Sequence, residues 1–145
     1  MDIPEYITVD EVKRVCRELN ISDWTQIVEP EIKRQEAEVI LKELNVEGMN
    51  IALDDFCAGL EVELEHGTRF KDANVTNNHP LLTGKIVLAH LKESLDYYKR
   101  LEVAELEGDL LKAISRKDIT KTEKLYKKLA DARCILSQSE SMQLG

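Results

Sequence analysis

Apolar residues recur at intervals of three and four positions along most of this chain, and this spacing constrains the fold more than any other feature. It places each apolar set on one face of an α-helix, where a core can cover it. Only six Gly and three Pro interrupt the 145 residues. Because Gly and Pro are the residues that most disrupt helices, their scarcity and the apolar spacing together predict an all-α protein.

The pattern divides into about five helices, which we expect to form a small helical bundle. The first follows Thr8, the start of a Thr-x-x-Glu capping box, and the second begins near Pro30. The third ends before Gly67, a residue type that often follows a helix. The fourth is long and bends near Gly108, and the fifth follows a second capping box at Thr120. The predicted spans are about 9–19, 30–44, 51–66, 81–115 and 120–136.

Residues 68–80 form the one substantial loop, which is rich in Asn, Asp and Thr. Those side chains can bond to the backbone of the loop, so we expect an ordered conformation. The loop joins the third and fourth helices, for which a central antiparallel hairpin is the simplest arrangement. Because no repeat or linker interrupts the pattern, we expect a single helical domain over residues 1–145, with an aperiodic tail at 137–145.

The composition is that of a globular protein, 43% hydrophobic and 33% charged. A formal net charge of −8 argues against binding along a nucleic-acid backbone, because phosphate binding requires a basic surface. The one basic stretch, 116–128, is read as a solvated helix face. No segment approaches the roughly 20 apolar residues of a membrane-spanning helix, and no signal peptide is visible. We therefore expect protein partners rather than a membrane or nucleic acid.

Two histidine–glutamate pairs are the feature that most suggests chemistry. Glu63-x-x-His66 and His90-x-x-Glu93 each have i, i+3 spacing, so each pair projects from one side of its helix. Sets of carboxylates and imidazoles bind divalent metals, and helical bundles build metal sites from Glu-x-x-His pairs. One hypothesis is therefore a metal-binding domain or a metal-dependent enzyme that uses Glu63, His66, His90 and Glu93 as ligands.

The interpretation that we favour for these residues is structural. His66 lies at a helix end, where the helix dipole favours a cation, and His90, Glu93 and Tyr97 share a stripe of the fourth helix. The metal pattern of helical bundles normally adds a Glu from each of two further helices, and none is evident here. We expect no other cofactor. The structural hypothesis is a hydrogen-bonded polar centre made of Glu63, His66, Asn77, His90, Glu93 and Tyr97.

Three sequence blocks follow one another within residues 59–101. They are ELEHG at 63–67, a polar loop that ends in Pro80-Leu81, and the pattern GKI-x-x-x-HL-x-E-x-x-DYY at 84–98. In this order the blocks resemble an uncharacterised domain family of bacterial and phage proteins. The resemblance implies a phage or prophage setting more than a chemistry. One departure is His79, which stands just before the proline, where that family commonly carries an acidic residue.

These observations together favour a small phage- or prophage-encoded helical protein that works by interaction, such as a virion component, rather than an enzyme. We expect it to act as a homo-oligomer or within a larger phage assembly, in the cytoplasm of the host cell or in the virion. Metal binding at the Glu/His cluster is the alternative.

Overall fold

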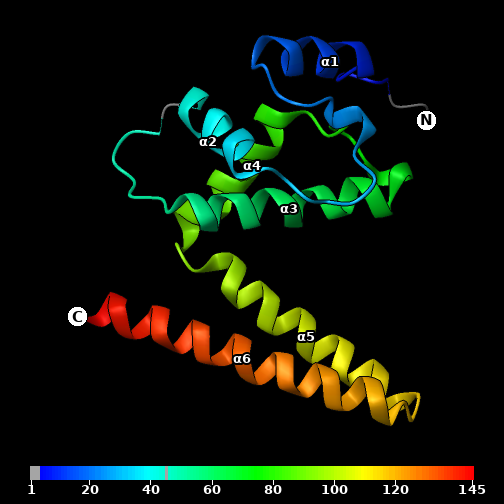
Figure 1. Cartoon of the computed structure of the whole chain (residues 1–145), viewed down its shortest axis with the longest axis vertical. Coiled ribbons are helices and arrows are strands. Elements are labelled where there is room, and N and C mark those ends of the chain that lie inside the picture. The colour runs from blue at the N-terminus through cyan, green and yellow to red at the C-terminus, as the bar shows by residue number, and fades with distance from the viewer. Residues whose placement is uncertain (1–3, 45) are drawn as a thin grey trace. The chain divides into compact units, whose positions relative to one another are not determined.

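The computed structural model describes residues 4–44 and 46–145 and is all-helical, as predicted. The described residues contain no β-strand, and none of their helices is long and apolar enough to cross a membrane. The elements are α1 (Val9–Glu18), η1 (Trp24–Gln26), α2 (Arg34–Glu43), α3 (Leu53–Arg69), η2 (Lys71–Ala73), α4 (Pro80–Glu93), α5 (Tyr97–Ser115) and α6 (Ile119–Leu144) (Figure 1).

The chain divides into two compact units, an N-terminal unit of Met1–Glu93 and a C-terminal unit of Ser94–Gly145. The helix predicted over 81–115 is wrong, because α4 ends at Glu93 and α5 begins at Tyr97. Polar bonds within the interruption explain the break. Asp96 accepts a hydrogen bond from the Ser94 hydroxyl and pairs with Arg100, and Tyr97 N–H donates to the Ser94 carbonyl in a turn.

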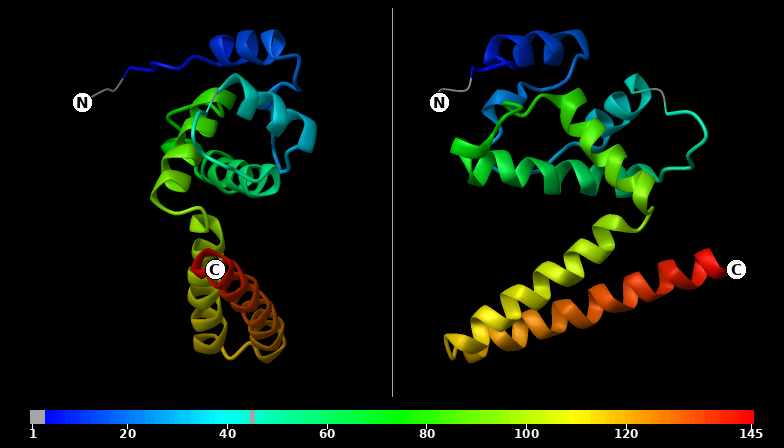
Figure 2. Two further views of the ribbon diagram at one scale, coloured as in Figure 1. Left: turned by 90° about the vertical axis from the view of Figure 1, so that its left-hand side faces the viewer. Right: turned by 180° about the vertical axis from the view of Figure 1, so that it is seen from behind.

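The predicted central hairpin is present in the N-terminal unit, where α3 contacts α4. α2 packs against both of these helices, and α1 contacts η1 and α4 (Figures 1 and 2). The buried side chains match the apolar positions of the sequence pattern, which explains why each helix faces inward as it does. They include Val12, Val15 and Cys16 of α1, Trp24 of η1, Ala37 and Ile40 of α2, Phe56, Leu60 and Leu64 of α3, and Val87 and Leu91 of α4.

The start of α1 is confirmed, because the Thr8 side chain accepts a hydrogen bond from Glu11 N–H. The reciprocal half of the capping box is replaced by an ion pair, in which the Glu11 carboxylate binds Arg14.

The start of α2 differs from the prediction, because the helix begins at Arg34 rather than near Pro30. Ile32 N–H donates to the Glu61 side chain of α3 at 3.0 Å, and Lys33 is extended. A tertiary hydrogen bond therefore holds this segment outside the helix. A second bond set fixes η1 nearby: the buried Glu36 carboxylate accepts hydrogen bonds from Ser22 and from Trp24 Nε1.

The end of α3 also differs, because the helix continues through Gly67 to Arg69. Gly67 is needed for close packing rather than as a helix terminator. A Cβ at this position would collide with Asn78 Oδ1 and would lie 2.7 Å from Asn74 Nδ2. The loop after α3 therefore lies directly against the α3 backbone.

The C-terminal unit is a hairpin in which α5 and α6 run side by side (Figure 2). Asp118 caps α6 by accepting from Lys121 N–H, so the capping box predicted at Thr120 is wrong. α5 passes through Gly108 without interruption. The aperiodic tail is also wrong: α6 extends to Leu144, and Glu140 pairs with Arg100 of α5 at 2.8 Å.

Candidate functional site

The α3–α4 hairpin brings the two predicted histidine–glutamate pairs together around Glu63. Glu63 Oε1 lies 3.5 Å from His90 Nε2, and Glu63 Oε2 lies 3.9 Å from His66 Nδ1. His90 Nδ1 in turn lies 4.0 Å from Glu93 Oε2. The Glu63 side chain is only 11% exposed, whereas His66 and Glu93 are on the surface. The four residues thus form a row in the order His66, Glu63, His90, Glu93.

The contacts in this row use different atoms at each step. Glu63 meets its two histidines through separate oxygens, and His90 meets its two glutamates through separate nitrogens. A metal requires its ligands to point at one centre, about 2.0–2.3 Å from each. Within the residues that the structure describes, no group of three His, Cys, Asp or Glu side chains is arranged to hold a metal. The row places one largely buried carboxylate between two imidazoles.

Two members of the predicted polar centre lie elsewhere. Asn77 Nδ2 donates to Glu5 Oε1 at 2.5 Å and to the Ile7 carbonyl at 2.6 Å, so it fastens the segment before α1 to the loop. Tyr97 belongs to the C-terminal unit, where its ring meets that of Tyr98 edge to face. Its inclusion depended on one helical stripe running from His90 to Tyr97, and the break before α5 removes that stripe.

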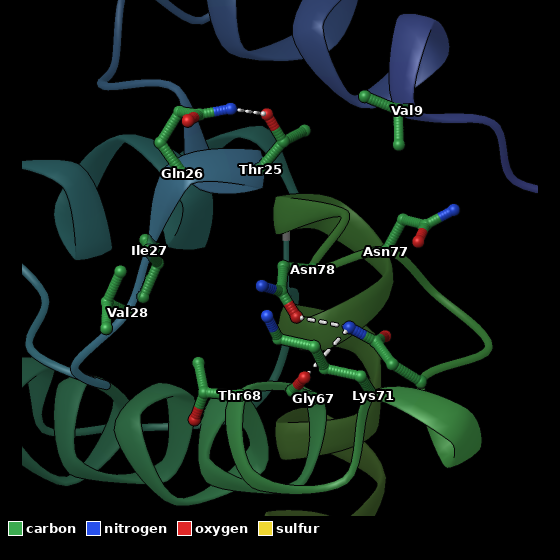
Figure 3. Close-up of a pocket in the computed structure, with 11 residues that line it drawn as sticks. Val9, Thr25, Gln26, Ile27, Val28, Gly67, Thr68, Lys71, Asn77 and Asn78 are labelled. Carbon is green, nitrogen blue, oxygen red and sulfur yellow. Dashed lines mark hydrogen bonds between the residues drawn. The ribbon is translucent and has the colours of Figure 1, made fainter.

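A pocket of about 430 Å³ lies in the N-terminal unit, between η1 and the end of α3. The predicted polar loop forms its other wall (Figure 3). Its apolar lining is Ile27 and Val28, which lie across the pocket from Asn78, and Val9, which lies apart from them near Asn77 (Figure 3). Its polar lining comprises Thr25 and Gln26 of η1, and Gly67, Thr68, Lys71, Asn74, Asn77 and Asn78.

Asparagine side chains hold the polar wall of the pocket in place. Asn74 Nδ2 donates to Asn78 Oδ1 at 2.9 Å and to the Gly67 carbonyl at 3.3 Å (Figure 3). Asn78 Nδ2 donates to the Trp24 carbonyl at 3.4 Å, which ties the loop to η1. Asn77 and Asn78 both have positive φ values, 49° and 60°, a conformation that asparagine tolerates better than most residues. These bonds confirm the predicted ordering of the loop by its own polar side chains.

Lys71 is the one charged residue that lines this pocket. It is exposed, and Figure 3 shows its side chain extending along the pocket wall below Asn78. No carboxylate in the described part of the chain lies within ion-pair distance of its ammonium group. The sequence-based prediction includes Asn77 but not Lys71 or the pocket, because η1 and the loop are far apart in sequence. The Asn-rich composition of the loop was the available signal.

A third feature is one face of the α5–α6 hairpin. Arg100 of α5 pairs with Glu140 of α6, and Glu107 pairs with Arg133 at 2.6 Å. The spacing of seven residues places Arg100, Glu107 and Ile114 on one stripe of α5, with Leu111 beside it. The same spacing places Ile119, Tyr126, Arg133 and Glu140 on one stripe of α6. Because the ion pairs join the stripes, both lie on the same side of the hairpin. We call this side the heptad face.

The heptad face is ionic near the base of the hairpin and apolar near its tip. Leu111, Ile114, Ile119 and Tyr126 occupy the tip, and each is more than half exposed. Exposed apolar residues that cluster in this way mark an interaction surface more often than isolated ones do. The sequence-based prediction lacks this face, because it has a tail at residues 137–145 and one continuous helix in place of α4 and α5.

The family model of DUF5661, described as a protein of unknown function, matches residues 12–107, and the chain belongs to this family. The match confirms that the chain has uncharacterised relatives. The three sequence blocks and the phage setting stay predictions. Comparisons with curated proteins and with solved structures found no match.

Proposed function

We propose that this protein is a small helical interaction protein that binds a second copy of itself through the heptad face. The observation that supports the proposal most strongly is the apolar tip of that face, formed by Leu111, Ile114, Ile119 and Tyr126. Each helix of the hairpin covers only one side of the other, so the C-terminal unit leaves these side chains uncovered. An apolar stripe on a helix is stable in water when another element covers it.

The distribution of charge between the two units favours a second copy of the chain as the partner that covers the heptad face. Of the 20 basic and 28 acidic residues in the chain, the C-terminal unit holds ten basic and nine acidic. The N-terminal unit therefore holds ten basic and 19 acidic, and carries the net negative charge. Two copies would repel one another through their N-terminal units and meet with little repulsion through their C-terminal units.

The pattern of the heptad face is also self-complementary. Each helix contributes one arginine and one glutamate, and an apolar pair lies at the tip end. In a two-fold symmetric pair the same patch meets itself, so apolar tips can contact apolar tips. The spacing of seven residues is that of helices that pack side by side in coiled coils and four-helix bundles.

The setting that we propose is a phage or prophage, with the protein in the host cytoplasm or in the virion. The resemblance of residues 59–101 to bacterial and phage proteins supports this setting. A self-associating helical protein fits a structural role in a larger phage assembly.

Sedimentation equilibrium of the full chain tests self-association. We expect a mass of twice the 16.6 kDa of one chain, with a dimer fraction that rises with concentration. Because the proposed contact is largely apolar, 1 M NaCl should not dissociate the dimer. A single species of 16.6 kDa throughout the concentration range would refute the proposal.

The second candidate function is metal binding at Glu63, His66, His90 and Glu93. It is supported by the position of the Glu63 carboxylate between two imidazoles, at 3.5 and 3.9 Å. Elemental analysis of protein purified without a histidine tag tests it. Binding predicts a stoichiometric divalent metal that Glu63→Gln removes and that raises the thermal stability of the wild type. A metal content near zero, with no change in stability on adding Zn²⁺ or Mn²⁺, would eliminate this candidate.

A further inference from the structure

We propose that the pocket between η1 and the polar loop binds a carboxylate that is attached to an apolar group, with Lys71 as its charge partner. This proposal concerns the N-terminal unit and is independent of self-association through the hairpin. A volume of about 430 Å³ lies in the range of small-molecule sites, which are roughly 300–1,000 Å³.

The charged residues around the pocket indicate that the ligand is negatively charged. The N-terminal unit holds 19 acidic and ten basic residues. Arg14, Lys33, Arg34 and Arg69 pair with carboxylates. Lys71 lines the pocket without such a partner in the described residues, and no carboxylate lines the pocket with it. The pocket is therefore lined by one cation and no carboxylate, and this charge favours an anion.

The polar wall suits a planar oxygen acid. Asn78 is 7% exposed, and its Nδ2 carries two hydrogens, of which the bond to the Trp24 carbonyl uses one. The second hydrogen and the Lys71 ammonium can donate to the two oxygens of one carboxylate. Such hydrogen bonds to a charged group are roughly twice as strong as neutral ones.

The apolar lining of the pocket indicates which chemical group of the ligand carries the carboxylate. Ile27 and Val28 present aliphatic groups across the pocket from Asn78 (Figure 3). An aliphatic body of the ligand would bury apolar area there, which favours binding. The shared chemistry is thus a carboxylate next to a branched aliphatic group. A free branched-chain acid and the carboxyl end of a polypeptide with a terminal leucine or valine both provide it.

The pocket is accessible at Val28 on its rim, which is 79% exposed. A free acid needs only the pocket, whereas a polypeptide end would also extend over the rim. The two sources therefore differ in how additional residues before the carboxylate affect binding.

The test follows backbone amide signals of the full chain by NMR during titration with N-acetyl-leucine. We expect saturable shifts confined to the pocket, at residues such as Thr68, Lys71 and Asn78. N-acetyl-leucinamide has the same shape without the charge, and should bind at least tenfold more weakly, because it lacks the charge-assisted hydrogen bond to Lys71. Lys71→Gln should abolish this discrimination, Lys71→Arg should retain it, and the control Lys42→Gln, outside the pocket, should leave it unchanged.

The titrations distinguish a free acid from the carboxyl end of a polypeptide, and they include results that would overturn the proposal. Tighter binding of N-acetyl-Gly-Gly-Leu than of N-acetyl-leucine supports a polypeptide end, and weaker binding supports a free acid. The proposal is overturned if no pocket signals shift up to the solubility limit, if the amide binds as tightly as the acid, or if Lys71→Gln leaves the discrimination intact. Because Lys71 is exposed, its substitution is not expected to unfold the protein, and the spectra report this directly.

Discussion

Glycine has opposite roles at two helical positions of this chain. In α3, Gly67 allows Asn74 and Asn78 to approach the helix backbone, whereas in α5 a Cβ at Gly108 would meet no atom within 4 Å. A methyl group costs free energy where it forces neighbours apart and contributes stability where it only restricts the unfolded chain. The two positions therefore form a matched pair for one substitution.

We predict that Gly67→Ala lowers the free energy of unfolding by about 1–3 kcal/mol, because the new methyl group displaces the asparagines of the pocket wall. Gly108→Ala, its control, should raise stability by about 0.5–1 kcal/mol. Urea denaturation monitored by circular dichroism measures both. An increase for both variants would show that the loop does not pack on Gly67 as described.

His79 occupies the position where the resembling family commonly has an acid, and its ring acts as a helix cap. Nδ1 accepts a hydrogen bond from Leu82 N–H at 3.4 Å, and Pro80 follows at the first position of α4, where a missing N–H has no cost. Only the neutral ring can accept this bond. Burial lowers the pKa of His79 below its ordinary value of 6.5, with a smaller opposite effect from nearby Glu11.

The expected consequence is a loss of stability in mild acid. Since the pKa of His79 is lower in the folded state, the unfolded chain binds the proton more readily, and stability falls as the pH drops below about 6.5. His79→Asn keeps a capping group that does not titrate. Thermal unfolding between pH 5 and 7.5 should show a shallower dependence on pH in this variant. Equal slopes would exclude a contribution from the His79 cap.

At the scale of single residues, the sequence predicts which histidines and glutamates pair, but it does not predict the pocket. Spacing of three residues identified Glu63 with His66 and His90 with Glu93, and the hairpin joined the pairs, because both features follow from helix geometry. Asn77 binds Glu5, 72 positions away, and Asn78 binds the Trp24 carbonyl, 54 positions away, and no local pattern predicts contacts between residues so far apart in the chain.

At the scale of elements, a polar network closes the base of the α5–α6 hairpin. Asp96 is buried at the start of α5, binds Arg100 Nε and Nη2, and accepts from Gln143 Nε2 at 3.2 Å. The Arg100 guanidinium, with help from Ser94 and Gln143, lowers the pKa of the Asp96 carboxyl from 3.8 to about 2, although burial opposes the shift. This network connects the first turn of α5 to the last turn of α6.

We predict that Asp96→Asn destabilises the C-terminal unit by about 2 kcal/mol at neutral pH, the free energy that corresponds to the lowered pKa. Because the folded-state pKa is the lower one, this contribution is present above pH 4 and is lost as the pH falls through about 2. Hydrogen exchange of α6 amides measures the effect. Asp131→Asn, an exposed position of the same helix, should change nothing, and equal effects of the two variants would contradict the role of Asp96.

The helix boundaries show where local pattern ceases to determine structure. The sequence correctly predicted an all-α fold, the start of α1 and the central hairpin, which depend on periodicity and a local cap. It misplaced the start of α2, because Glu61 of α3 binds Ile32 N–H. It also missed the last turns of α6, whose polar residues are helical alongside partners on α5. Both errors arise because contacts between residues far apart in the sequence determine where these helices begin and end.

At the scale of the whole molecule, the excess of acidic residues and most of the family match both fall in the N-terminal unit. The family match ends at residue 107, within α5, so it includes the Glu/His row and all of the pocket residues except Val9, but not the apolar tip of the hairpin. The acidic N-terminal unit carries the proposed ligand site, and the nearly neutral C-terminal unit carries the proposed self-association surface. The two proposals can therefore fail or succeed separately.

Two isoleucines provide the most direct test of the heptad face. Ile114 lies on that face and is 54% exposed, whereas Ile135 of α6 is 51% exposed and lies on the opposite side of the hairpin, about 180° around the helix from Tyr126. The decisive measurement is sedimentation equilibrium of Ile114→Glu and Ile135→Glu, with helix content checked by circular dichroism. We predict that Ile114→Glu is monomeric at concentrations where the wild type and Ile135→Glu are dimeric. A dimer that survives Ile114→Glu, or that both substitutions dissolve equally, would contradict assembly through this face.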